Sequence, residues 1–221
     1  SMMNRDLIGT FNTSSNDMSD ISLGALIQLR ETDESTWHAE VTLQKSIGDS
    51  NAKDEVLTPM GLDMEMILPY GMQIGDSAMR LVLGITNVKT LNEKLVWGNQ
   101  LRGRLVISED GWSFGDQTEL NTWLQYELDA SVSFSSRLKF IHQDKITGNN
   151  PMISAPVQTA NPENYGGREW HLGLGVNFLT HFLPGDVDRF GLEITIPLKQ
   201  DKINLQMKTN YQISFGYQKI F

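Results

Sequence analysis

Hydrophobicity with a period of two recurs along most of this chain and constrains its fold more than any other feature. In the last segment, apolar or aromatic residues occupy nearly every second position from Leu205 to Phe221. A helix would mix the two alternating sets on every face, whereas a strand separates them onto opposite sides of a sheet. The pattern predicts a strand of about 17 residues here, roughly three times the usual length in soluble sheets.

Eight further segments alternate in the same way, at residues 21–29, 37–47, 79–85, 95–107, 120–128, 132–140, 170–178 and 190–198. We therefore expect about nine long amphipathic strands and no amphipathic helix. The connections at 31–35, 89–92 and 129–130 are short, and 180–188 is somewhat longer, whereas long polar loops lie near 48–73 and 148–165. Long loops at one end and short turns at the other are typical of an outer-membrane barrel.

A soluble sandwich also has strands with one apolar face, so alternation does not decide between the two folds. The sequence contains no run of about 18 uncharged apolar residues, which excludes an ordinary transmembrane helix but not a transmembrane strand. Most segments exceed the length of about 9–11 residues that a tilted strand needs to cross the hydrocarbon. Charged residues deep in the strands and aromatic residues near the strand ends favour the membrane barrel.

Two sets of residues follow from this assignment. The polar positions predict the lining of the lumen: Glu40, Arg80, Arg102, Arg104, Trp123, Glu127, Arg137, Lys139, His171, Glu193 and Lys208. The apolar positions predict aromatic girdles that face the membrane. These are Trp37, Trp97, Tyr126, Phe134, Phe178, Phe190, Tyr217 and Phe221 toward the short turns, and Phe140, Trp170 and Tyr211 toward the long loops.

The C-terminal residue Phe221 carries a further signal. A last strand that ends in an aromatic residue, with apolar residues at every second position before it, resembles the segment by which the barrel-assembly machinery recognises outer-membrane barrels. Lys219 departs from that pattern. If Phe221 ends in the periplasm, the short turns lie there too. A single-chain bacterial barrel has an even number of strands, so about nine strands predict that further strands lie upstream of residues 1–221.

Three short stretches are similar to a known family: Leu68–Gly75, Asn161–Pro162 and Gly166–Phe178. They resemble the outer-membrane transporter family named after the MetA pathway of phenol degradation, over most of the chain from about Ser14 to Phe221. The resemblance implies a single antiparallel transmembrane β-barrel domain of about twelve strands, of which residues 1–221 form a part. It implies no catalytic residues, and the phenol-degradation name is not evidence for an aromatic substrate.

Composition narrows the range of chemistry. The formal net charge is −9, which argues against nucleic-acid binding, and the absence of cysteine removes thiolate metal sites. The histidines His38, His142, His171 and His181 have no metal-ligand spacing, and Ser136 and His142 lie too far apart along one strand to act together. We expect no catalytic residue, no cofactor, no metal site and no enzymatic activity.

Loop acids form two groups, Asp49, Asp54 and Glu55, and Glu109, Asp110 and Asp116. Their spacing does not match a calcium-binding loop, so solvated loop charge is preferred over a divalent-cation site. The loop at 48–73 is long enough to fold back as a plug or gate. In the lumen, charges that set solute preference and ion pairs that fill a narrow barrel remain equally open.

The leading interpretation is a channel or transporter for small solutes in the bacterial outer membrane, with a charged polar lumen. Its expected partners are outer-membrane lipid, lipopolysaccharide and the barrel-assembly machinery, together with a protein partner or further copies of the chain. The alternative, from another class, is a structural barrel that sheathes or anchors a partner.

Overall fold

The computed structural model describes residues 2–5, 9–57, 61–154, 157–180 and 187–220. Its main element is one antiparallel sheet of nine strands, each paired with its neighbours along the chain. The strands are β3 (Asp20–Glu31), β4 (Ser35–Ser46), β7 (Met79–Asn92), β8 (Leu95–Ser108), β10 (Gln117–Glu127), β11 (Val132–Gln143), β13 (Gly167–Thr180), β14 (Val187–Lys202) and β15 (Gln212–Ile220). The prediction of an all-β chain with about nine antiparallel strands is confirmed.

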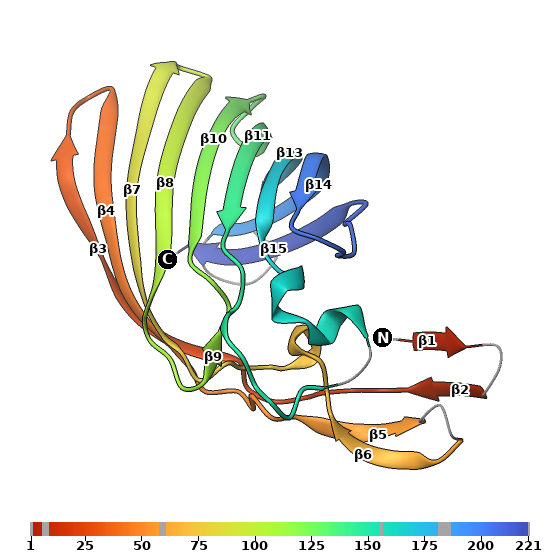
Figure 1. The fold of residues 1–221 in the computed structure, drawn as a ribbon. Coiled ribbons are helices and arrows are strands. Elements are labelled where there is room, and N and C mark those ends of the chain that lie inside the picture. Colours follow the sequence, from red (N-terminus) through yellow and green to blue (C-terminus); the bar gives the residue numbers. More distant parts are fainter. Residues whose placement is uncertain (1, 6–8, 58–60, 155–156, 181–186, 221) are drawn as a thin grey trace.

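The connections sort by length as expected. The described turns 32–34, 93–94 and 128–131 lie at one end of the sheet, and the described parts of the connections 47–57, 61–78, 109–116, 144–154 and 157–166 lie at the other (Figure 1). The β3–β4 turn is closed by two backbone hydrogen bonds, from Thr32 to Ser35 and from Ser35 back to Thr32. The β7–β8 turn is residues 93–94 rather than the predicted 89–92, because β7 continues to Asn92, whereas β8 begins at Leu95 as the pattern indicated.

The prediction for the last strand is wrong in its first half, because β15 begins at Gln212 rather than near Leu205. The β14–β15 ladder ends at the pair Thr195 and Gln212. Beyond it, the side-chain amide of Gln200 donates to the carbonyl of Thr209 and accepts from its N–H, at 2.8 and 3.0 Å. A side chain thus takes the place of the backbone ladder over this segment.

The sheet curves into an open trough (Figure 1). Its edge strands β3 and β15 each pair on one side only. Short elements occupy the loops: the hairpins β1 (Met2–Arg5) with β2 (Gly9–Asn12) and β5 (Lys53–Leu57) with β6 (Asp63–Ile67), the pair β9 (Trp112–Ser113) with β12 (Thr147–Gly148), and the 3₁₀ turns η1 (Tyr70–Met72), η2 (Gln158–Ala160) and η3 (Pro162–Asn164). No helix in the described chain is long and apolar enough to cross a membrane.

Burial is inverted relative to a soluble sheet protein. The hydrophobic core cluster comes from the loops and consists of Ile67, Tyr70, Trp112, Ile146, Ile153 and Ala160. Apolar residues of the strands are instead exposed: Leu124 by 45%, Leu174 by 55% and Phe215 by 71%. Within the described residues these apolar side chains remain exposed, whereas the inner faces of a two-sheet sandwich are buried.

Candidate functional site

In each strand the polar residues lie on the face opposite the apolar one, which we call the polar face. The register aligns these residues in rows across the sheet. One row joins Glu40 of β4, Gly84 of β7 and Arg102 of β8. The next row toward the loops joins Thr42, Val82 and Arg104 of the same three strands. Because side chains in one row lie on one face, charges two strands apart come within reach of each other.

A glycine separates the two partners of the best-formed ion pair. The guanidinium of Arg102 donates from Nε and Nη2 to Glu40 Oε2 and Oε1, at 3.0 and 2.9 Å. These side chains pass over Gly84, where an added Cβ would lie 3.1 Å from Glu40 Oε2. Bidentate arginine–carboxylate contacts are the stronger and more directional ion pairs. The ion pair can lie against the sheet because Gly84 of the intervening strand has no side chain.

A related ion pair lies farther around the sheet, with its two charges in adjacent rows, because Arg137 is opposite Gly173 and Glu193 is opposite Gly175. Arg137 of β11 forms an ion pair with Glu193 of β14, at 3.2 Å between Nε and Oε2, although the contact lacks hydrogen-bond geometry. Gly173 of β13 lies between them, and its added Cβ would be 3.2 Å from Glu193 Cδ. The glycine leaves room for the side chain of Glu193 on the polar face.

A third glycine receives an aromatic ring. Gly98 of β8 lies directly opposite Trp123 of β10, and an added Cβ would be 2.1 Å from two atoms of the indole. The ring of Trp123 therefore occupies the space that a side chain at position 98 would fill.

A buried ion pair joins the sheet to the loops. Arg80 at the start of β7 binds Asp76, and these residues are only 4% and 2% exposed. Asp76 also accepts from the N–H of Phe114 at 2.9 Å, which brings the segment after β8 to the same carboxylate. Burial alone would raise the pKa of Asp76, but the hydrogen bonds from Arg80 and Phe114 and the arginine charge hold it below its usual value.

The loop cluster that this pair supports is aromatic. The rings of Tyr70 and Trp112 are 4.7 Å apart in an edge-to-face arrangement, and Phe114 and Tyr165 pack beside them. Burial raises the pKa of Tyr165 to about 12. Sequence reasoning missed this cluster because its residues lie in segments without periodicity; the apolar residues at 66–70 and 112–114, inside polar loops, were the available signal.

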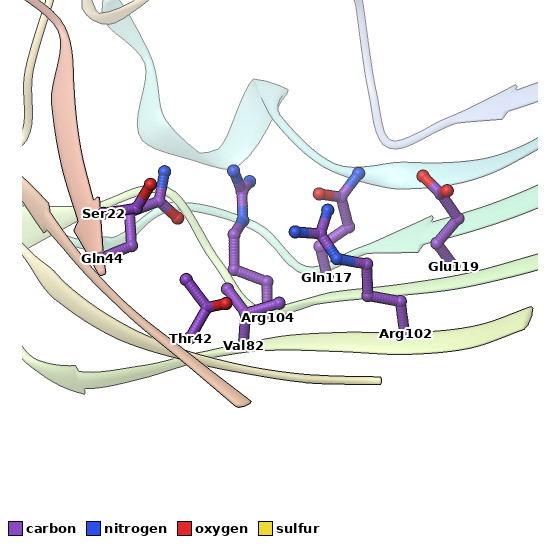
Figure 2. Close-up of a pocket in the computed structure, with 8 residues that line it drawn as sticks. All are labelled: Ser22, Thr42, Gln44, Val82, Arg102, Arg104, Gln117 and Glu119. Atoms are coloured by element: carbon purple, nitrogen blue, oxygen red, sulfur yellow. The ribbon is translucent and has the colours of Figure 1, made fainter. Parts of the chain in front are cut away.

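The polar face contains a cavity of about 130 Å³ beside Arg104, lined by Ser22, Thr42, Gln44, Val82, Arg102, Arg104, Gln117 and Glu119. Figure 2 shows the Arg104 side chain standing away from the sheet between Gln44 and Gln117. Arg104 forms no hydrogen bond or ion pair with any described residue, and its Nε is buried without a partner. This side chain sits in the row next to the Glu40–Arg102 pair, where Val82 replaces the glycine and Thr42 replaces the glutamate.

Most residues predicted to line the lumen lie together on this polar face. They are Glu40, Arg80, Arg102, Arg104, Trp123, Arg137, Lys139, His171 and Glu193, with Glu127 exposed at the short-turn end. Lys139 lies 3.9 Å from Glu119, and His171 lies 3.2 Å from Glu169. Lys208 departs from the prediction: it is exposed and lies outside the strands, because β15 begins later than expected.

The aromatic residues predicted for the girdles lie mainly on the opposite, apolar face. They are Trp37, Trp97, Tyr126, Phe134, Phe140, Trp170, Phe178, Phe190 and Tyr217. The rings of Phe140 and Trp170 are 4.8 Å apart, and those of Phe190 and Tyr217 are 5.2 Å apart. Tyr211 precedes β15 and lies outside the strands, and Phe221 lies outside the described residues.

Three of the loop acids, Asp49, Asp54 and Asp116, accept hydrogen bonds from the protein's own backbone. Asp54 accepts from the N–H of Ser14 at 2.6 Å, and this bond and one from Glu55 lower its pKa. Asp116 accepts from the N–H of Val106 at 2.7 Å. Among the described residues, no group of three or more His, Asp or Glu is placed to hold a metal ion.

No model of a known protein family matches the chain. No curated protein matches its sequence either.

Proposed function

We propose that the nine-stranded sheet forms part of the wall of a bacterial outer-membrane barrel, and that this barrel binds or passes small solutes without catalysing a reaction. The observation that carries the proposal is the inverted burial: apolar side chains are exposed along the strands, while charged side chains pair on the other face. Soluble monomers rarely expose contiguous apolar patches larger than a few hundred Å². Lipid covers such a face at no cost in desolvation.

Strand length supports the same proposal. Eight of the nine strands have 11 to 16 residues, and about 9–11 tilted residues are enough to cross the hydrocarbon core. A sheet in lipid must also close, because unpaired backbone groups are costly there. The proposal therefore includes further strands between the edges of β3 and β15, as in the transporter family that the sequence resembles.

A structural barrel that sheathes or anchors a partner is the second candidate. The ion pairs over Gly84 and Gly173 favour it, because paired charges stiffen a wall without attracting a solute. The unpaired Arg104 beside a cavity favours the solute-binding function.

Conductance in planar lipid bilayers distinguishes the two. We expect the purified protein to produce discrete current steps, and Arg102→Ala and Arg104→Ala to shift the reversal potential in a salt gradient toward cation preference. Arg168→Ala, which removes an exposed arginine of β13 away from the cavity, is the matched control and leaves ion preference unchanged. Membrane-inserted protein that carries no current would contradict the channel proposal and favour the structural barrel.

A further inference from the structure

We propose that Arg104 and the cavity beside it form a binding site for an oxyanion, the carboxylate or phosphate group of a small solute. This inference rests on the proposed function and deepens it by naming the class of solute. Arg104 lies beside paired charges on the polar face, and it has no partner of its own among the described residues.

Three charged neighbours of Arg104 each have a partner of opposite charge. Arg102 is held by Glu40 through two hydrogen bonds, and Arg80 is held by the buried Asp76. Glu119, the acid that lines the cavity, accepts from Asn121 at 2.6 Å and lies 3.9 Å from Lys139. The cavity therefore contains one positive charge that no side chain within 4.0 Å offsets.

Two more distant carboxylates act on Arg104 through space only. Asp20 and Asp76 each interact with its charge electrostatically, without forming an ion pair with it. Asp76 is occupied by Arg80, and Asp20 accepts instead from the side-chain amide of Gln44 at 2.6 Å. Neither carboxylate supplies the in-plane, two-oxygen contact that a guanidinium favours.

Neutral donors surround the free guanidinium. Gln117 lies opposite Arg104 on β10, and Ser22 lies across the cavity on β3; the side chains of both make no hydrogen bond within the described chain. Figure 2 shows the amide of Gln117 on one side of Arg104 and the hydroxyl of Ser22 on the other. The volume of about 130 Å³ is several times the ~30 Å³ that one water molecule occupies in the liquid, so an anionic group fits.

An unpaired, partly buried guanidinium is costly, because its desolvation is not repaid by a partner. The neighbouring row shows how this sheet pairs an arginine: a glutamate two strands away and a glycine between them. At Arg104 both elements are missing, since Thr42 and Val82 occupy those positions. An oxyanion from a solute supplies the missing charge, and the arginine fork selects carboxylate or phosphate over a spherical halide.

Binding of inorganic phosphate and of acetate to the detergent-purified protein, measured by isothermal titration calorimetry at constant ionic strength, tests this site directly. We expect saturable binding of at least one of them, a loss of tenfold or more in Arg104→Gln, and a smaller loss in Arg104→Lys, which keeps the charge without the fork. Arg168→Gln removes the same charge away from the cavity and is expected to bind within twofold of the parent. Chloride at equal ionic strength controls for general charge screening.

The inference is overturned if neither phosphate nor acetate binds saturably, or if Arg104→Gln binds both as well as the parent. Because Arg104→Gln removes an unpaired charge, the variant is expected to fold, and Arg104→Lys supplies a second test if it does not. Failure of the proposed function has a different signature. Phosphate binding without any bilayer current leaves the anion site in place and argues against the channel, whereas current without Arg104-dependent binding argues against the anion site alone.

Discussion

Replacement of Gly98 by alanine tests the packing of the polar face most sharply. Gly98 lies in β8 and does not have a positive φ, so its backbone accepts an alanine without strain. The obstacle is Trp123, since the new Cβ would lie 2.1 Å from two indole carbons. Carbon atoms pack at about 3.5–4.0 Å, so the ring must move by about 1.4 Å or the strands must separate.

Overpacking of this kind costs about 1–3 kcal/mol, and we expect Gly98→Ala to lower the free energy of unfolding by that amount. The matched control is Gly103→Ala on the same strand, where an added Cβ meets nothing within 4 Å. We expect this change to be neutral or to stabilise by about 0.4–1 kcal/mol, because alanine has less freedom than glycine in the unfolded chain. The assay is reversible urea unfolding in lipid vesicles, followed by far-ultraviolet circular dichroism.

A double variant separates a clash from a general effect on β8. Trp123→Ala removes the ring, so adding Gly98→Ala to it costs little, with a coupling energy of about 0.5–3 kcal/mol between the two sites. The reasoning is refuted if Gly98→Ala and Gly103→Ala unfold at the same urea concentration. Equal effects of Gly98→Ala with and without Trp123 would refute it too.

Three further predictions concern the loops and the cavity. Asp76→Asn breaks a buried ion pair and should lower the free energy of unfolding, measured by urea titration, by about 3–5 kcal/mol. Because the pKa of Asp76 is lowered in the folded protein, the stability that its carboxylate contributes is present above about pH 3.8 and is lost only as the pH falls further. The pKa of Tyr165 is raised from 10.0 to about 12, so its neutral form contributes fully to folding stability below pH 10, and this contribution is lost between pH 10 and 12. Absorbance at 295 nm should show a late tyrosine ionisation that Tyr165→Phe removes. Thr42→Glu combined with Val82→Gly rebuilds the neighbouring pairing arrangement at Arg104, and should abolish phosphate binding in calorimetry while raising the urea midpoint.

The strands were predictable because their signal is local. Alternation fixes which residues share a face, and it placed Glu40, Arg102 and Arg104 together on the polar face, as the register confirms. Alternation gave a wrong prediction for Leu205 to Tyr211, where the hydrophobic pattern continues although β15 begins only at Gln212. Pro197 lacks an amide hydrogen two residues past the last β14–β15 pair, and the amide of Gln200 then bonds the backbone of Thr209.

Pairing of charges on the polar face was not predictable from the sequence. Arg102 and Arg104 are two residues apart with the same alternation, yet one is fully paired and the other has no partner within 4.0 Å. Their difference is set by residues of β4 and β7, which come beside them only through the cross-strand register. The loop cluster was hidden for a related reason, since Tyr70 and Trp112 lie 42 positions apart in segments that carry no periodic signal.

At three glycines of the polar face, a side chain from another strand occupies the space that a larger residue would fill. Gly84 and Gly173 admit carboxylates that reach an arginine two strands away, and Gly98 admits the ring of Trp123. Large side chains therefore lie along the wall at these points, and their charges are neutralised there. Arg104 differs because Val82 fills the position beside it, and its guanidinium stands away from the sheet (Figure 2). A sheet that only had to be stable would gain by pairing or removing this charge, and so the unpaired arginine supports the oxyanion site that we propose.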